Sequence, residues 1–226
     1  MIKTTIILAF AISLTSCVNT SSLKNTRIDF NNPDKVKNQI VFTHDTYKKQ
    51  TTFQTPNLGT EFDQLFIRGS LNDDSPSINF QIYIADYYYG DWRFYHSAYD
   101  SLGKKLKTTQ ISRDIISCTS RLYGCSHKEH VGILTSYSYL KNATTSGINL
   151  KVYGKAGDAT FYIPGGYIVG LLSAIDEYPA RLKEEMLSYK SAMEALESID
   201  KHESNDYKTI KELYDSTKER IDIMKK

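Results

Sequence analysis

The apolar positions of the chain change their period along the sequence. Between about residue 38 and residue 163 they alternate with polar positions, which is the period of a strand with one buried face. The clearest run is 78–84, where isoleucine or phenylalanine occupies every second position. Runs of the same kind predict further strands at 39–47, 62–71, 92–98, 106–111, 131–135, 148–152 and 159–163.

The links between these runs are short and rich in turn residues. Gly90-Asp91 predicts a hairpin between 78–84 and 92–98. No helical pattern separates the strands, so we do not expect the helical crossovers that parallel strands need. The pattern predicts a β-rich α+β fold whose main part, 38–176, is an antiparallel β-sandwich or barrel.

The C-terminal part changes to helical spacing. Apolar residues between 167 and 175 predict a short helix that closes one end of the sheets. From Pro179 onward two heptad-like stripes predict a C-terminal α-hairpin over 178–226, with Asn205 as the N-cap of its second helix. The stripes consist of Leu182, Met186, Tyr189, Met193 and Leu196, and of Tyr207, Ile210, Tyr214, Thr217, Ile221 and Met224.

The N-terminus has the features of a secretory signal, with Lys3, a short apolar run from Ile6 to Leu14 and small residues after it. The run is too short to cross a bilayer, which needs ~20 residues. Its end, Leu14-Thr15-Ser16-Cys17, resembles the lipobox of bacterial lipoproteins. The resemblance implies removal of the signal peptide 1–16, lipidation of Cys17 and anchoring in the cell envelope. An ordinary signal peptide with an unrelated cysteine is the alternative.

Two further features complete this part of the prediction. Val18 follows the lipidated cysteine, and by analogy with enterobacterial sorting it favours the outer membrane. Residues 18–37 are rich in Asn, Ser, Thr and Lys and have no sustained periodicity. We therefore expect a lipidated, flexible tether over 17–37, between the membrane and the folded domain.

Composition excludes several classes of function. The 226 residues include 28 Lys and Arg against 26 Asp and Glu, so the net charge is +2 and gives no support for nucleic-acid binding. A hydrophobic fraction of 40% and a mean hydropathy of −0.42 exclude a protein with many membrane spans and a disordered chain. The 17 tyrosines and 9 phenylalanines favour strands.

Cys118 and Cys125 are the two cysteines that remain after Cys17. An exported chain meets an oxidising compartment, so the pair predicts a disulfide. Closing an eight-residue loop contributes about 2.5 kcal/mol in the chain-entropy model. Metal ligation and redox chemistry are alternatives, but the C-x6-C spacing and the lack of a second cysteine pair disfavour them.

A group of short motifs between 116 and 168 carries a second resemblance. The motifs are Ile116-Ser117-Cys118, Gly124-Cys125, Glu129, Gly154-Lys155 and Ile163-Pro164-Gly165-Gly166-Tyr167-Ile168. They are similar to those of uncharacterised small lipoproteins and exported proteins of Gram-negative bacteria. The resemblance supports the location and the fold, and it implies no activity.

Two clusters could carry binding chemistry. The aromatic residues Tyr87, Tyr89, Trp92, Tyr95 and Tyr99 could stack sugars or hold a peptide, although cross-strand pairing and core packing are the favoured explanation.

His127, Glu129 and His130 are weak candidates for a metal site, since their spacing does not fit the helical zinc motifs. On a strand, His127 and Glu129 would face one way and His130 the other. We expect no metal and no cofactor.

No catalytic motif stands out, because both the G-x-S-x-G nucleophile turn and the phosphate-binding loop are missing. We therefore expect a non-enzymatic envelope lipoprotein that binds an envelope protein or supports an assembly through 178–226. One alternative is a glycan or small-ligand binding module that uses the aromatic cluster. Another is a hydrolase with an unrecognised site around His96, His127 or Glu129.

Overall fold

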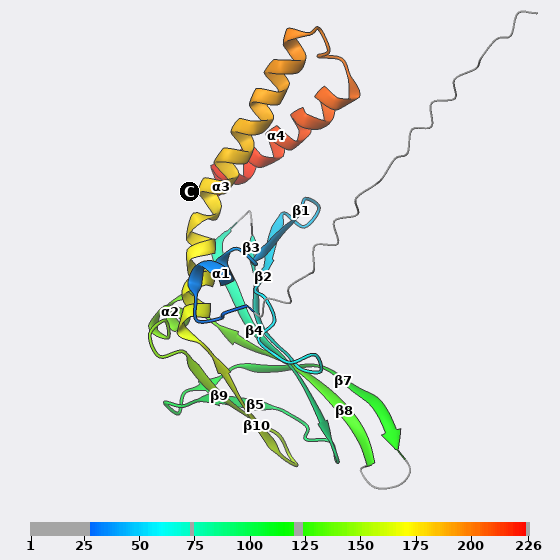
Figure 1. Cartoon of the computed structure of the whole chain (residues 1–226), viewed down its shortest axis with the longest axis vertical. Coiled ribbons are helices and arrows are strands. Elements are labelled where there is room, and N and C mark those ends of the chain that lie inside the picture. Colours follow the sequence, from blue (N-terminus) through cyan, green and yellow to red (C-terminus); the bar gives the residue numbers. More distant parts are fainter. Residues whose placement is uncertain (1–27, 73–74, 120–123, 225–226) are drawn as a thin grey trace, which may run out of the picture.

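Two antiparallel sheets and a pair of long helices form the protein, shown in Figure 1 as a computed structural model that describes residues 28–72, 75–119 and 124–224. The larger sheet has the order β1-β2-β3-β4-β8-β7, with β1 Val41–Asp45, β2 Gln50–Gln54, β3 Gln64–Asn72, β4 Ser75–Tyr89, β7 Thr108–Thr119 and β8 Gly124–Thr135. The smaller sheet has the order β10-β9-β5-β6, with β5 Ser97–Asp100, β6 Lys105–Leu106, β9 Ile148–Tyr153 and β10 Asp158–Ile163. The predicted β-rich α+β class is confirmed.

The core lies between the inner faces of the two sheets. Ile82 and Ile133 of the larger sheet and Leu150 of the smaller sheet are fully buried in it. Helix α3, Gly165–Ser198, covers one end of this core with its first three turns, where Tyr167 and Leu171 are also fully buried. Both sheets are open in the described chain, so the architecture is that of a sandwich.

Most of the predicted strands are present, but the predicted hairpin at Gly90-Asp91 is wrong. Strand β4 pairs with β3 and β8, whereas β5 begins only at Ser97 and pairs with β6 and β9 of the other sheet. The segment between them crosses from one sheet to the other. Phe94 has a φ of 55° within this segment, in the left-handed region, which an extended strand cannot contain.

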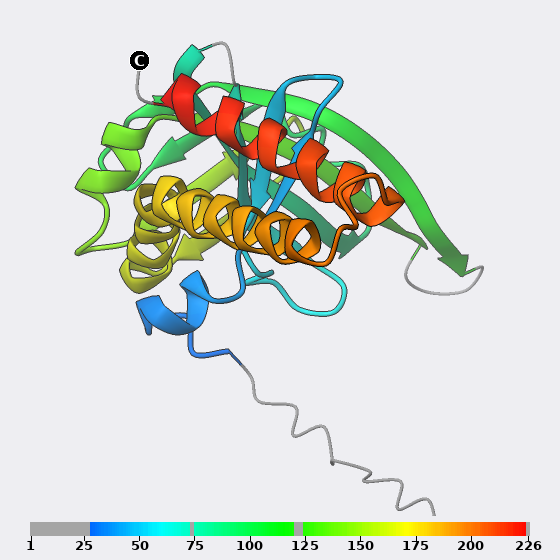
Figure 2. The same cartoon turned by 90° about the horizontal axis from the view of Figure 1, so that it is seen from above.

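The β7–β8 ribbon is longer than the sequence indicated, and it curves strongly (Figures 1 and 2). Its register shifts twice, between Gln110 and Ser112 and again between Ile115 and Ser117. Each shift adds a residue to β7 without a partner on β8, and such bulges bend a strand and increase its twist. The bulges also mask the alternation of β7, so the sequence pattern ends early at residue 111.

The expected tether 17–37 is wrong in its last part, because residues from 28 onward belong to the fold. Helix α1, Pro33–Lys37, begins at the N-cap Asn32, whose side chain accepts from the amides of Asp34 and Lys35. Val36 is fully buried against α3. The glycines of α3 allow this close contact, since a Cβ on Gly170 would lie 2.5 Å from the carbonyl oxygen of Pro33.

The closing helix and the first arm of the hairpin are a single helix. Helix α3 runs without a break through Pro179 and the boundary predicted at 176–178. Proline removes one helical hydrogen bond, but the buried side chains of Ile175, Tyr178 and Leu182 hold the helix on both sides of it. No helix in the described chain has the length and apolarity needed to cross a membrane.

Candidate functional site

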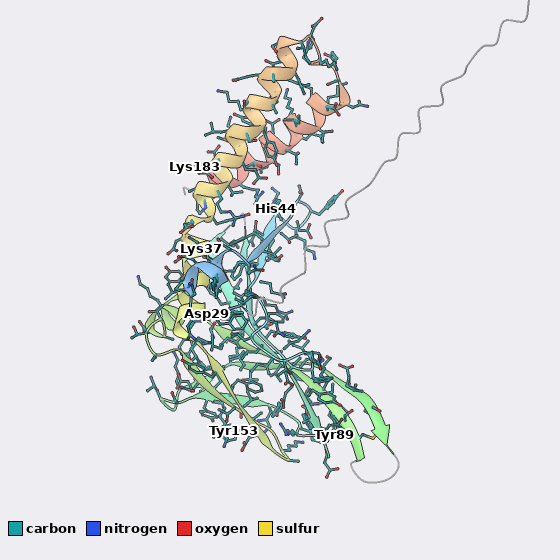
Figure 3. All side chains as sticks on the ribbon, viewed as in Figure 1. Asp29, Lys37, His44, Tyr89, Tyr153 and Lys183 are labelled. Atoms are coloured by element: carbon teal, nitrogen blue, oxygen red, sulfur yellow. A yellow bond between two sulfur atoms is a disulfide. The ribbon has the colours of Figure 1, made fainter. Side chains whose placement is uncertain are left out.

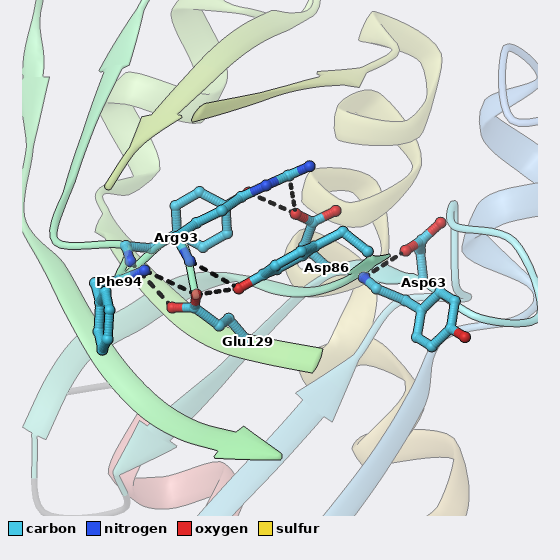
Figure 4. A network of polar contacts seen from close by, with 8 residues as sticks. Asp63, Asp86, Arg93, Phe94 and Glu129 are labelled. Carbon is cyan, nitrogen blue, oxygen red and sulfur yellow. Dashed lines mark hydrogen bonds and ion pairs between the residues drawn. The ribbon is translucent and has the colours of Figure 1, made fainter. Parts of the chain in front are cut away.

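A buried polar network lies where the chain crosses between the sheets (Figure 4). Its centre is Glu129, whose side chain points inward from β8 and is 1% exposed. One carboxylate oxygen accepts from the Tyr88 hydroxyl and, at 2.8 Å, from the amide of Phe94. The other accepts from the amide of Tyr95 and from Nε of Arg113, each at 3.0 Å. Glu129 therefore fixes the crossover to the larger sheet.

A second buried carboxylate extends the network. Asp86 lies directly opposite Glu129 on the neighbouring strand β4. Its Oδ2 accepts from the Tyr95 hydroxyl at 2.5 Å and from Nη1 of Arg93 at 2.8 Å. The guanidinium of Arg93 also lies over the ring of Tyr88, 4.1 Å from its centroid.

The two carboxyl groups have opposite pKa shifts. Burial raises the pKa of Asp86, and the hydrogen bond from Tyr95 and the charge of Arg93 offset this only in part. Burial also opposes ionisation of Glu129, but the bonds from Tyr88, Arg113 and two backbone amides outweigh it and hold the pKa of Glu129 below its usual value. Neighbouring carboxyl groups whose pKa values are shifted in opposite directions occur in enzymes that use acid–base catalysis.

The two carboxyl groups do not border a hollow that could hold a substrate in the part of the chain that the structure describes. Three hollows found among the described residues are lined by other side chains, and neither Asp86 nor Glu129 borders any of them. A catalytic pair needs a cavity beside it. The geometry thus supports a structural role for Asp86 and Glu129, the joining of two sheets.

The aromatic residues singled out in the sequence are not brought together. Tyr87 and Tyr89 lie on the outer face of β4, where Tyr87 stacks on Phe62 with ring centroids 5.5 Å apart. Tyr95 is buried in the polar network. The two others lie elsewhere. Trp92 packs on His127 with centroids 4.1 Å apart, and Tyr99 belongs to the smaller sheet beside Tyr153.

The histidines are also separated. His127 and Glu129 point inward from β8, while His130 points outward, bonds the Tyr83 hydroxyl at 2.6 Å and lies 3.2 Å from Asp114. His96 is exposed. Among the described residues no three His, Cys, Asp or Glu side chains converge as metal ligands.

The predicted cysteine pair is a disulfide in the structure, with the two Sγ atoms 2.03 Å apart. Cys118 and Cys125 face each other at the end of β7 and β8. Cys17, with the whole lipobox, lies outside the described residues.

The base of the helical hairpin is firmly packed on the larger sheet. Tyr178 of α3 stacks on Phe42 of β1, with ring centroids 4.3 Å apart and planes 9° from parallel. Leu182 and Ile221 are buried beside this pair. Helix α4, Asn205–Met224, reaches the same place from the opposite direction, and Arg220 contacts the Tyr178 hydroxyl.

Beyond this base the hairpin projects away from both sheets (Figures 1 and 3). Helices α3 and α4 lie side by side (Figure 2), and from Leu182 to Ile221 the residues of the predicted stripes are partly or fully buried. Between 183 and 216 no described side chain is fully buried. Even the seam residues Met193 and Ile210 are only partly covered, and Leu187 and Leu213 are 59% and 44% exposed. The N-cap of α4 is Ser204, which accepts from the amide of Tyr207, and not Asn205.

Sequence reasoning missed Asp86, Arg93 and Arg113. A signal was present, because Asp86 follows Ile82 and Ile84 on the inner face of β4, and Glu129 precedes Val131 on the inner face of β8. A charged residue that continues an inward-facing apolar series is a sign of a buried polar network.

Comparison with known proteins gives no relative from which a function could be transferred. No protein-family model matches the chain, and a search of the curated proteins finds no match.

Proposed function

We propose that this protein is a lipid-anchored protein of the bacterial cell envelope, most consistent with the outer membrane, and that it works by binding a protein partner through its C-terminal hairpin. The observation that carries the proposal is the arm formed by residues 183–216, which projects from the sandwich and contains no fully buried side chain. Two helices alone cannot enclose a heptad seam, so its apolar positions remain partly in water. A helix of a partner would cover them.

The packing at the base of the arm suggests that the sandwich serves to hold the arm in place. The stacked pair Phe42 and Tyr178 fixes the arm to β1, and an ion pair at 3.9 Å joins Lys49 of the β1–β2 turn to Glu219 of α4. The arm is therefore held in one direction relative to the sheets. Such an arm meets a partner with little loss of conformational entropy.

The proposed location has separate support. The lipobox at Leu14–Cys17 implies the lipid anchor, and several acyl chains on one residue hold a protein firmly in a membrane. A disulfide between Cys118 and Cys125 suits an oxidising compartment outside the cytoplasm.

Photo-cross-linking in cells tests the function. A photoreactive amino acid at Leu187 or at Leu213 should cross-link one defined envelope protein. The same group at Leu102, which is 91% exposed in a turn of the sandwich, should not. Leu187→Lys combined with Leu213→Lys should abolish the complex without unfolding the chain, because both side chains are exposed. The proposal would be refuted if the same proteins were cross-linked at all three positions, or if neither position of the arm gave a cross-link.

The anchor is tested in the same cells. Cys17→Ser should move the protein from the membrane fraction to the soluble fraction. A protein that stays with the membrane after this change would contradict lipidation at Cys17.

A further inference from the structure

The outer face of the larger sheet, opposite the core, contains a groove of about 870 Å³. It crosses β1, β2, β3 and β4 and reaches Leu134 of β8. The cluster Tyr87–Tyr99 is not part of it, and neither is the helical arm. Its volume lies within the ~300–1,000 Å³ that is usual for small-molecule sites. It is therefore large enough for a ligand of several rings.

The strand register places the polar side chains of the groove in two rows that run across the strands. Directly opposed pairs on β2, β3 and β4 define them. Neighbouring strands lie ~4.8 Å apart, so each row offers a polar group at that interval. One row is Thr52, Ser70 and Asn79, and the other is Gln54, Arg68 and Gln81.

The chemistry of the groove is unusual for a solvated sheet face. Charged residues make up 24% of the chain, yet Arg68 is the only one among the seventeen residues that line the groove. The other polar side chains among these seventeen are all amides or hydroxyls. Each of these groups both donates and accepts hydrogen bonds.

Two contacts hold the centre of the groove in place. Nε of Arg68 donates to Oε1 of Gln81 at 2.9 Å, and its guanidinium lies over the Tyr83 ring, 4.6 Å from the centroid. The amide of Gln81 also occupies the space left by Gly132, where a Cβ would lie 2.3 Å from its nitrogen. The two side chains are thus oriented before any ligand arrives, which lowers the cost of binding.

We propose that this groove binds a neutral oligosaccharide. Sugar hydroxyls donate and accept at once, as amides and hydroxyls do, so the two rows are complementary to them. The described residues of the groove include one cation and no carboxylate, which makes a poor site for a phosphate chain or a metal ion, and the polar rows make a poor site for a lipid.

The test uses the mature chain with Cys17→Ser on an array of neutral oligosaccharides, followed by calorimetry with the best binder. Gln81→Ala and Gln54→Ala should each lower the affinity about tenfold, because each removes an amide that hydrogen-bonds the sugar hydroxyls. The matched control is Gln64→Ala, an exposed glutamine on the outer face of β3 away from the groove. It should leave the affinity unchanged.

Gly132→Ala gives an independent variant. The three atoms nearest to its methyl group belong to the side-chain amide of Gln81, which can be displaced without a shift of the backbone, so the fold should survive and the affinity should fall as in Gln81→Ala. The proposal is overturned if no neutral glycan binds, if binding responds to Gln64→Ala and not to the groove variants, or if extended peptides bind in the groove and glycans do not. Leu187→Lys should not affect glycan binding, so this result is separate from that of the helical arm.

Discussion

Replacing Glu129 by glutamine should be among the most destabilising conservative changes in this chain. The carboxylate accepts four hydrogen bonds, two on each oxygen. Glutamine has the same shape but only one acceptor oxygen. Whichever way its amide turns, an NH₂ group faces two donors of the network. Arg113 also loses the buried charge beside it.

The size of the effect follows from this count. A hydrogen bond to a charged group contributes ~1.5–3 kcal/mol, so the loss of two predicts a fall of about 3–6 kcal/mol in the free energy of unfolding. A domain of this size has only ~5–15 kcal/mol in total. The loss of stability should be larger still because of Phe94, whose left-handed backbone conformation costs energy. The hydrogen bond from its backbone N–H to the Glu129 carboxylate offsets that cost in the wild type.

Urea unfolding followed by the fluorescence of Trp92, the only tryptophan, measures this effect beside the network. The midpoint should fall while the slope stays constant. Glu177→Gln is the control. Its carboxylate, 53% exposed, makes an ion pair with Lys37 at 3.1 Å, and losing it should cost less than ~1 kcal/mol.

The dependence on pH gives a second readout. The pKa of Glu129 is lower in the folded state than its ordinary value of 4.5. Its ionised form therefore stabilises the fold above pH 4.5, and this contribution is lost as the pH falls through the folded-state pKa. The gap between wild type and Glu129→Gln should narrow in acid. A loss no larger than that of Glu177→Gln, or a gap that widens in acid, would refute the reasoning.

Two further predictions concern the disulfide and the contact between α1 and α3. Replacing both Cys118 and Cys125 by alanine should lower the free energy of unfolding by about 2.5 kcal/mol, measured in urea, and a reductant should affect only the wild type. Gly170→Ala should lower the melting temperature, because overpacking against Pro33 at ~1–3 kcal/mol exceeds the ~1 kcal/mol gain in helix propensity. The control is the exposed Ser188→Ala on the same helix. A more stable Gly170→Ala would mean that residues 28–37 do not pack on α3.

Sequence periodicity was sufficient where one face of an element is buried along its whole length. This explains the agreement for β4, β9 and β10 and for the two stripes of the hairpin. It failed at 92–98, where the alternating pattern is present but the chain bends at Phe94. The bend depends on Glu129, 35 residues away in the sequence, and alternation within one segment carries no information about such a partner.

Two of the helices also depend on contacts between distant residues, which local sequence patterns do not reveal. At Pro179 the local rule predicts a helix end, but burial of Tyr178 and Leu182 on the sheet outweighs the lost hydrogen bond. At α1 the local signal was present in Asn32-Pro33, an N-cap followed by a proline suited to the first turn, within a segment whose composition resembles a tether. The packing of α1 on α3 makes this segment part of the fold, and that contact joins parts of the chain that are distant in the sequence.

The arrangement of the helices also bears on the proposed sites. Helices α1 and α3 cover one end of the sandwich, and the α3–α4 arm leaves from β1, so no described helix covers the outer face over β2, β3 and β4. A face that only needs to be soluble carries mixed charges, as the helical arm does. The polar rows around Arg68 carry amides and hydroxyls in register, and neither the core nor the polar network requires them there. The proposed oligosaccharide, which presents hydroxyl groups along its length, would explain why these amides and hydroxyls lie in rows.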